Sequence, residues 1–376
     1  MEKRVTRIRQ KLGSVGSAVV LGIMILIAIA LIVNRDRLTM DALSRAWNYR
    51  SLGTAQQAEE FLFQDYFSNT FALLGDSIAV ASVSGLRVYD RTGAMAHREI
   101  FSMERPVIES SGPRALAYDL GGIGIAVSST RETLWHTAWS GAIIDARINE
   151  NDWLVISAER MGTRGVVTVL NPDFHPVYEV RIGTGYLIGA TLAPDNRTLA
   201  ILTMTDGGGQ ILWYHTDYAG EYPYSRYLRE DTLFFDFWFT AGGNLMAISS
   251  NGIVSLTTAG TVAFEYPFAD QYLRAYARQD AGAAFYLTPH PNSMEGTLVH
   301  LPPNGRARGI EVQGELLDIS LNERYLVALF FDRLVLYRDG REYAIWDGTE
   351  GMTRVLSKND GSVLRFSTHR ARLLVP

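Results

Sequence analysis

The distribution of apolar residues along the chain changes near residue 34. Residues 12–33 form an uncharged, almost wholly apolar run of 22 residues, and roughly 20 apolar residues are enough for a helix to cross a bilayer. Beyond residue 34, short apolar segments alternate with turns rich in Gly, Asn and Asp, which is typical of β-strands joined by tight turns. The pattern predicts one transmembrane helix, 12–33, followed by one large β domain.

Short strands with a small or branched apolar centre recur along the β domain. Their average spacing of about 41 residues is typical of one four-stranded propeller blade. Eight copies each follow a turn, at residues 77–80, 124–127, 153–156, 198–201, 245–248, 283–286, 326–329 and 363–366. They predict an all-β fold, an eight-bladed β-propeller. Seven blades are the alternative, because the second copy ends only 29 residues before the third.

The last copy lies too close to Pro376 to be followed by a complete set of strands. The segment Phe61–Tyr66 belongs to no copy, and its apolar and polar residues alternate roughly as in a strand. We therefore predict a propeller domain over residues 59–376, in which residues near 59–67 complete the last blade and remove open sheet edges. Residues 34–58 are predicted to form a juxtamembrane helical stalk with a short helix at 39–49, and residues 1–11 a basic cytoplasmic tail.

The charges that flank the apolar run predict its orientation. Five cations and one acid precede it, so the positive-inside rule favours a cytoplasmic N-terminus and a β domain displayed outside the cell membrane. A cleaved signal peptide is the alternative, because Ala28-Ile29-Ala30 has the small-x-small form of a cleavage site. Ser14, Ala18 and Gly22 recur every four residues, a spacing that predicts close helix packing and a homodimer through the span.

Composition restricts the partners and cofactors. Without its first 34 residues the chain has 30 basic and 39 acidic side chains, a net charge of −9, which argues against nucleic acid and anionic lipid surfaces as partners of the domain. The absence of cysteine excludes disulfides, thiolate catalysis and Cys-ligated metals. The seven histidines lack metal-ligand spacing. Neither a metal nor a cofactor is expected.

Two segments carry a family resemblance. Residues 193–201 read Ala-Pro-Asp-Asn-Arg-Thr-Leu-Ala-Ile, which resembles the Pro-Asp-Gly-Arg-x-Leu-Ala turn and strand of WD40-like and quinoprotein-like propellers. Residues 84–93 resemble the outer hairpin of the same repeats, and the whole chain is similar to uncharacterised membrane-anchored propeller proteins of Gram-positive bacteria. The Trp-Asp and Gly-His pairs of true WD40 repeats are missing. The resemblance therefore implies the fold, and it transfers no partner surface or catalytic residue.

One charged position recurs ahead of successive copies, on the expected innermost strand of each blade. It lies eleven or twelve residues before the end of the copy and is occupied by Asp145, Asp236, Arg274, Asp318 and Arg354, with Gly189 between the first two. One interpretation is a structural belt of ion pairs and hydrogen bonds between blades. The other is a ligand site at the mouth of the channel, because convergent polar groups in a concavity are typical of binding sites.

A second candidate site is aromatic. Residues 213–240 contain 11 of the 41 aromatic residues of the chain. Part of this segment is turn-like, and Tyr together with Arg is typical of interface hot spots. We predict a partner-contact edge made by Tyr218, Tyr222, Tyr224, Arg226 and Tyr227. Ordinary packing of an outer strand is the alternative.

The sequence carries none of the common catalytic motifs. His-Glu-x-x-His, Gly-x-Ser-x-Gly and the Gly-Lys-Ser phosphate loop are all missing. We therefore expect a non-enzymatic, membrane-tethered binding or scaffold module for envelope proteins or glycans. The alternative is a carbohydrate-acting hydrolase or lyase that uses the carboxylates of Asp145, Asp236 and Asp318.

Overall fold

The computed structural model describes residues 41, 45, 60–63, 69–218 and 222–376. The chain divides into two compact units, Met1–Gln57 and Ala58–Pro376. The predicted span 12–33, with Ser14, Ala18 and Gly22, lies outside the described residues, as does nearly all of the predicted stalk. Asp41 and Arg45, which are described, are helical. Within the described ranges, no helix has the length and apolar character needed to cross a membrane.

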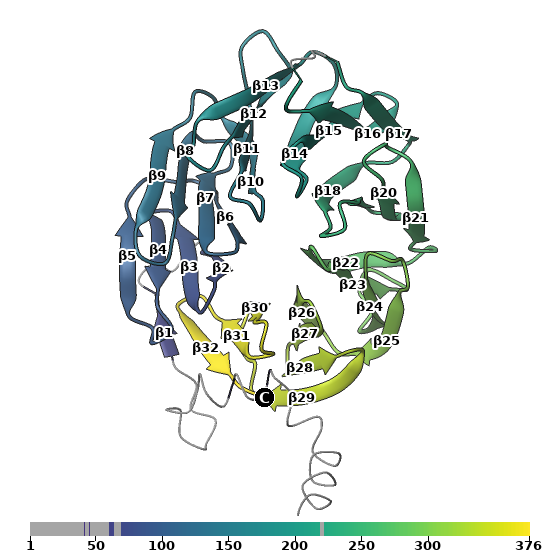
Figure 1. Ribbon diagram of the computed structural model, residues 1–376. Coiled ribbons are helices and arrows are strands. Elements are labelled where there is room, and N and C mark those ends of the chain that lie inside the picture. Colours follow the sequence, from purple (N-terminus) through teal and green to yellow (C-terminus); the bar gives the residue numbers. More distant parts are fainter. Residues whose placement is uncertain (1–40, 42–44, 46–59, 64–68, 219–221) are drawn as a thin grey trace, which may run out of the picture. The chain divides into compact units, whose positions relative to one another are not determined.

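The second unit is an eight-bladed β-propeller, which confirms the predicted fold. Eight antiparallel sheets of four strands each are arranged in a ring (Figure 1). In the first seven blades, the strands follow one another in sequence from the centre of the ring to its periphery. Each blade thus corresponds to one repeat of the sequence.

The first four blades take in residues 70–230. The first contains β2 (Thr70–Leu74), β3 (Ser77–Ser82), β4 (Gly85–Tyr89) and β5 (Met95–Glu99). The second contains β6 (Pro106–Ser111), β7 (Arg114–Asp119), β8 (Gly124–Ser128) and β9 (Thr133–Ala138). The third contains β10 (Ile143–Ile148), β11 (Leu154–Ala158), β12 (Gly165–Leu170) and β13 (Pro176–Ile182). The fourth contains β14 (Tyr186–Leu192), β15 (Thr198–Thr205), β16 (Gly208–His215) and β17 (Ser225–Glu230).

The remaining blades complete the ring. The fifth contains β18 (Phe234–Phe239), β19 (Leu245–Ser249), β20 (Gly252–Leu256) and β21 (Val262–Pro267). The sixth contains β22 (Tyr272–Gln279), β23 (Gly282–Thr288), β24 (Glu295–Leu301) and β25 (Arg308–Gln313). The seventh contains β26 (Leu316–Asn322), β27 (Tyr325–Phe330), β28 (Arg333–Arg338) and β29 (Arg341–Asp347). The eighth contains β30 (Arg354–Ser357), β31 (Val363–Phe366), β32 (Arg370–Leu374) and β1 (Glu60–Leu62).

The sequence repeats correspond to the second strand of a blade, with one exception. Every residue of β11, β19, β23 and β27 is buried, because both faces of such a strand pack against neighbouring blades. This explains why these strands are apolar throughout and do not alternate. The copy at 124–127 is instead β8, the third strand of its blade. Its true counterpart is β7, so the short spacing arose from a mismatch of strands, and no blade is missing.

The last blade is closed from the other end of the domain. β1 pairs antiparallel with β32, with Phe61 opposite Ala371, where the sequence analysis placed a closing strand near residues 59–67. Phe61 and Phe63 are buried, and the ring of Phe63 lies 5.3 Å from that of Phe71 in the first blade. The apolar side chains next to β1 thus join the eighth blade to the first.

The antiparallel order divides the loops between two faces of the ring. One side of the ring carries the loops from second to third strands and the loops from each outer strand to the next inner strand, and we call it the upper face. The lower face carries the loops from first to second and from third to fourth strands. The predicted turn at 193–197 lies on the lower face, where Asn196 has a φ of 57° in place of the Gly of related turns. Glu60, the first residue of β1, lies toward the lower end of the eighth blade.

Candidate functional site

The charged positions predicted from the repeats lie on the innermost strands, but they are not all equivalent. Asp145, Asp236 and Asp318 occupy matching places on β10, β18 and β26, each directly after a break in the pairing with the second strand. In β22 the matching residue is Ala275. Arg274 is the bulged residue before it, and a bulge redirects side chains. Arg274 is exposed and forms no ion pair with a described residue.

Arg147 brings two of the predicted acids together. From β10, its Nε lies 2.9 Å from Oδ2 of Asp145, and its Nη2 lies 2.9 Å from Oδ1 of Asp236 in the fifth blade. Its Nη1 donates to the carbonyl oxygen of Phe237, and the guanidinium lies over the Phe237 ring at 4.9 Å. One buried side chain therefore connects the third blade to the fifth, bypassing the fourth.

Arg278 extends this connection across the ring. From β22 in the sixth blade, its Nε lies 2.8 Å from Oδ2 of Asp236, and its Nη2 pairs with Glu109 on β6 in the second blade. The second and sixth of eight blades stand opposite each other, as β6 and β22 do in Figure 1. These ion pairs therefore span the channel from one side to the other. We call Glu109, Asp145, Arg147, Asp236 and Arg278 the channel cluster.

Two tyrosines complete the hydrogen bonding of the channel cluster. The hydroxyl of Tyr276 donates to Oδ2 of Asp236 at 3.1 Å, and the hydroxyl of Tyr118 donates to Oδ1 of Asp145 at 3.4 Å. The backbone N–H of Phe237 donates to Oδ1 of Asp236 at 2.8 Å. Asp236 thus accepts bonds from two guanidinium groups, a phenol and an amide, and such saturation compensates a buried charge.

The pKa values of the two aspartates of the channel cluster are shifted in opposite directions. Burial raises the pKa of Asp145, and the opposing effect of Arg147 is too small to reverse it. Burial acts the same way on Asp236, but the charges of Arg278 and Arg147 outweigh it and lower the pKa of that carboxyl. Burial also raises the pKa of Tyr276, with a further contribution from Asp236, so its hydroxyl stays a donor at neutral pH. Asp236 is the charged centre of the cluster.

The remaining predicted pair lies apart from the channel cluster. Nη1 of Arg354 on β30 lies 3.3 Å from Oδ1 of Asp318, and the backbone N–H of Val355 donates to Oδ2 of Asp318 at 2.9 Å. This contact joins the seventh blade to the eighth. The residues found at the recurring charged position therefore belong to two separate groups: Asp145 and Asp236 to the channel cluster, and Asp318 and Arg354 to an ion pair between neighbouring blades.

Gly189 marks the point where the recurring charge is interrupted. A Cβ atom at this position would lie 2.4 Å from Oδ2 of Asp145, closer than non-bonded atoms can approach. The glycine therefore provides the space that the Asp145 carboxylate occupies while it binds Arg147. A charged side chain at 189 is incompatible with this arrangement.

Three members of the channel cluster were missed by the repeat alignment. Arg147 lies two residues beyond Asp145 and thus on the same side of β10, and Arg278 lies four residues beyond Arg274 on β22. An inspection of alternate positions along the expected inner strands would have found both. Glu109 was missed because the second repeat was aligned on its third strand, so Ala117 of β7 was taken for its inner position.

The predicted aromatic edge lies on the lower face and on the outermost strand of the fourth blade. Tyr218 and Tyr222 are exposed by 72% and 84%, and Arg226 is also exposed. Tyr224 stacks on His215, and its hydroxyl donates to the carbonyl oxygen of Thr258 at 2.8 Å in the fifth blade. Tyr227 packs partly against the core that contains Phe234. The edge thus divides into exposed contact candidates and residues that join two blades.

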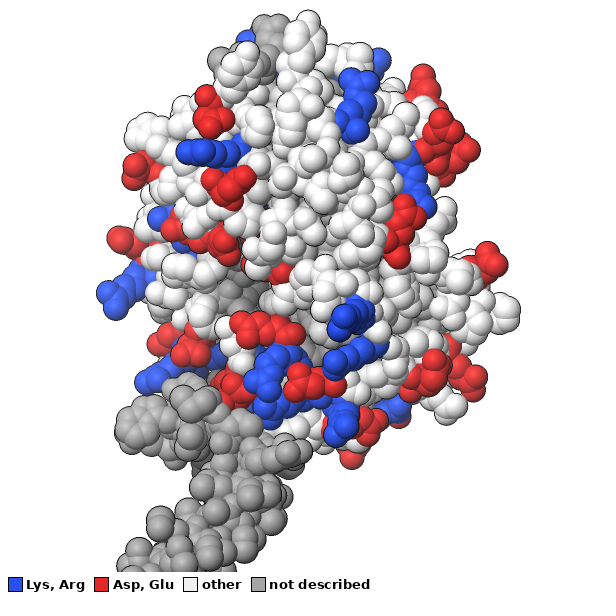
Figure 2. All heavy atoms as spheres, turned by 45° about the vertical axis from the view of Figure 1, so that its right-hand side comes forward, with Lys and Arg blue, Asp and Glu red and all other residues white. Residues whose placement is uncertain are grey.

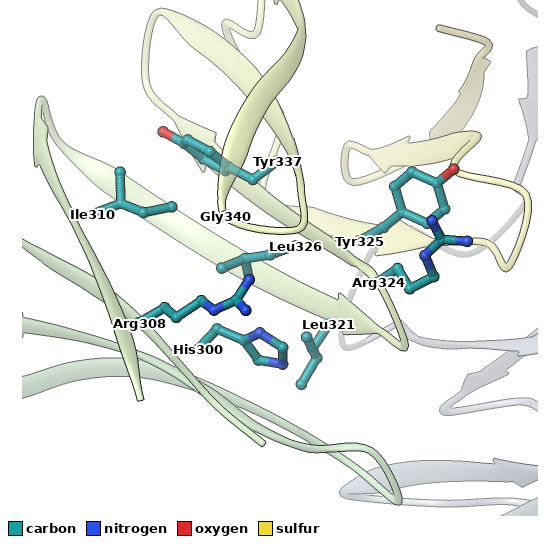
Figure 3. A pocket seen from close by; sticks show the side chains of 9 residues that line it. All are labelled: His300, Arg308, Ile310, Leu321, Arg324, Tyr325, Leu326, Tyr337 and Gly340. Atoms are coloured by element: carbon teal, nitrogen blue, oxygen red, sulfur yellow. The ribbon is translucent and has the colours of Figure 1, made fainter. Parts of the chain in front are cut away.

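A crevice between the sixth and seventh blades is too small for a ligand. It is lined by His300 and Arg308 from β24 and β25, and by Tyr325, Tyr337 and their neighbours from the seventh blade (Figure 3). Its free volume is about 10 Å³, which is room for roughly one water molecule. Among the described residues, no group of three or more His, Asp or Glu side chains is arranged to hold a metal ion.

A protein-family model described as "Family of unknown function (DUF5711)" matches residues 47–296, which is most of the chain. The chain belongs to this family. The matched residues run from the predicted stalk into the sixth blade and contain the positions of the channel cluster. No curated protein matches the sequence.

Solved structures similar to this chain are propellers. The C-terminal WD40 domain of Sif2 superposes with a TM-score of 0.61 at 12% identity, covering 86% of this chain and all of that domain. Sqt1 from Saccharomyces cerevisiae gives a TM-score of 0.58 at 10% identity, covering 85% of this chain and 97% of that one. A eukaryotic initiation factor gives a TM-score of 0.56 at 11% identity, covering 83% of this chain and 90% of that one. At such low identity these similarities establish a WD40-like fold alone.

Proposed function

We propose that the protein is a non-enzymatic binding or scaffold module, tethered to the cell membrane by residues 12–33 and displaying its propeller outside the cell. Its partners would be envelope proteins or glycans, recognised by exposed side chains on the rigid ring. Tethering near the membrane would raise the effective concentration of such partners. Tyr218, Tyr222 and Arg226 are candidates for the contact because they are exposed.

The observation that carries this proposal is the state of the channel. The acids Asp145 and Asp236 hold a common arginine, and the opposite blades are connected through Arg278. The charged side chains of the channel are thus paired with one another, which favours the exposed surface of the ring as the place of recognition. The hydrolase alternative has less support for the same reason: its proposed carboxylates are engaged in ion pairs, and Asp318 lies in a separate pair.

The absence of cysteine makes the proposed topology directly testable. Met161 is fully exposed, so a Met161→Cys variant carries one accessible thiol and needs no background cysteines removed. A membrane-impermeant maleimide should label it in intact cells. Val327→Cys, which is buried, should stay unlabelled, and Glu2→Cys should react only after permeabilisation. Labelling of Met161→Cys that also requires permeabilisation would contradict an external propeller.

The binding role is tested by proximity labelling from the full chain in its native membrane. A binding module should enrich a reproducible set of envelope neighbours, and Tyr222→Ala with Arg226→Ala should reduce that enrichment if the aromatic edge makes the contact. The matched control is Val177→Ala, an exposed position on the outer strand β13. Equal neighbour sets from the propeller and from an unrelated protein carried on the same membrane anchor would refute a specific binding role.

A further inference from the structure

Exposed apolar side chains are distributed unequally between the two loop faces. Among the described residues, the loops of the lower face expose large apolar side chains only between β16 and β17, at Tyr218, Tyr222 and Tyr224. The loops of the upper face expose seven, namely Val83, Ile100, Ile123, Met161, Leu233, Met294 and Phe331. Strand residues near the loops add Leu62, Tyr186, Phe235, Tyr272 and Leu317 on the upper side, and Met95, Leu134, Val177 and Val262 on the lower side. Scattered exposed apolar residues are ordinary on a protein surface, but a concentration on one face marks an interaction site.

Local geometry at the channel mouth increases this exposure. The inner strands β10, β14, β18, β22 and β26 all contain an irregularity in their pairing near their upper ends. Bulges of this kind redirect side chains and are common beside functional sites. Phe235 and Leu317 are themselves bulged residues, exposed by 42% and 37%. The ring of Phe235 contacts that of Tyr276 at 5.7 Å, so apolar surface continues down to the channel cluster.

The charges among these apolar side chains are mostly acidic. The upper loops and the last two residues of adjoining strand ends expose eleven carboxylates, from Glu104, Glu159, Asp206, Glu230, Asp231, Asp270, Glu295, Glu315, Asp332, Asp347 and Glu350. Six arginines are exposed in the same region, namely Arg98, Arg105, Arg160, Arg164, Arg181 and Arg354, and Arg274 is exposed one residue further along β22. In the side view of Figure 2, charged groups of both signs lie beside one another in several places, and a wide area between them carries few charges. The upper face therefore combines apolar contact area with an excess of negative charge.

We propose that the upper face docks a basic, apolar polypeptide segment of a partner protein. This inference rests on the proposed binding function and adds to it the surface that binds and the chemistry of the partner. The excess of carboxylates favours cationic partners and steers their approach. It disfavours an anionic lipid surface. It also disfavours a second copy, because a two-fold contact would place the same acidic face on both sides.

Photo-crosslinking from the full chain in native membranes tests the proposal. A benzophenone side chain is placed at Tyr272 or Met161 on the upper face, at Val262 on the outer strand β21, and at Tyr222 on the lower face, all of them exposed. Mass spectrometry then identifies the crosslinked segment. Tyr272 and Met161 should crosslink to segments that are basic and apolar, several-fold more strongly than Val262, and added salt should reduce the yield.

Charge-neutral variants provide the matched comparison. Asp231 and Asp270 of the upper face and Asp339 of the lower face are all exposed and have positive φ values of 52°, 64° and 51°, a conformation that asparagine tolerates. Asp231→Asn with Asp270→Asn should lower the crosslinking yield from Tyr272 several-fold, whereas Asp339→Asn should leave it unchanged.

Three results would overturn the assignment. Crosslinks mainly to lipid, to a second copy or to acidic segments would exclude the proposed partner chemistry. Crosslinks confined to Tyr222 would refute the upper face while leaving the binding function in place. Specific crosslinks from none of the four positions would refute both the surface and the proposed function.

Discussion

Glu109 and Arg278 form an ion pair across the centre of the ring, between the second blade and the sixth. Contacts in a propeller are otherwise made mainly between adjacent blades, as in the apolar clusters here. Through Asp236 and Arg147 the pair also engages the third and fifth blades. The geometry of the ring is therefore constrained from its centre as well as between neighbours.

Two arginines of one strand allow a matched test of this constraint. Arg278→Met removes the arginine that pairs with Glu109 and leaves Asp236 with Arg147 as its one arginine partner, and removing one side of a buried ion pair costs about 3–5 kcal/mol of unfolding free energy. Arg274 lies four residues earlier and is exposed, so Arg274→Met should change the unfolding free energy by less than about 0.5 kcal/mol. Denaturant unfolding of the two variants checks the difference. Equal losses of unfolding free energy in the two variants would mean that the ion pairs of Arg278 do not stabilise the ring.

The lowered pKa of Asp236 predicts how stability depends on pH. Its charged form is favoured by folding, so its contribution is complete above the ordinary aspartate pKa of about 3.9 and is lost as the pH falls through the lower folded value. Asp236→Asn should therefore lower the Tm most at neutral pH, and its deficit relative to wild type should shrink below roughly pH 4.

Asp145→Asn is the internal control for this titration. Folding disfavours the charged form of Asp145, whose pKa is raised by burial, so removing its charge should cost less at neutral pH than the same change at Asp236. Tm measured against pH for both variants distinguishes them. Identical profiles would contradict the assignment of Asp236 as the charged centre.

Gly189 should tolerate no side chain. Because a Cβ there meets the carboxylate of Asp145 at 2.4 Å, Gly189→Ala forces the channel cluster to rearrange, with an expected cost of about 1–3 kcal/mol. Gly183 has open space at its Cβ position, so Gly183→Ala should be neutral or slightly stabilising. The unfolding free energies of the two variants check this. A neutral Gly189→Ala would show that the carboxylate is free to move.

Because the segment around β1 closes the ring, we expect the loss of a buried side chain there to lower the stability of the whole domain. Phe63→Ala removes a buried ring that contacts the first blade, and should lower the unfolding free energy by about 3–5 kcal/mol. Leu62, its neighbour, is 65% exposed, and Leu62→Ala should have little effect. Denaturant unfolding of both variants checks the difference. If Phe63→Ala is equally harmless, the last blade does not depend on its N-terminal strand.

The fold was predictable because its signal repeats. The second strands of the blades are buried on both faces, as β19 and β27 are, and this makes them similar apolar segments at a regular interval. The assignment of the second blade was wrong because β7 and β8 are both short, apolar and preceded by a turn. Sequence spacing alone does not distinguish two such adjacent strands.

The channel cluster was only partly predictable, for a geometric reason. The recurring position found Asp145 and Asp236, whose places on their strands match. It also selected Arg274, because the turn between β22 and β23 is shorter than the turn between β18 and β19, so a count of twelve residues passes the matching Ala275 and reaches the bulged residue. The pairing of Glu109 with Arg278 joins residues 169 positions apart, and only closure of the ring brings them together.

The pairing of β1 with β32 also has a consequence for biogenesis. Glu60 lies opposite Arg372, so the first strand to leave the ribosome must wait for the last before its hydrogen bonds can form. Until then both ends present bare edges, and contacts between such distant residues form slowly. Maturation of the disc is thus a late, all-or-none event, and chaperones that shield β edges are expected to act on the emerging chain.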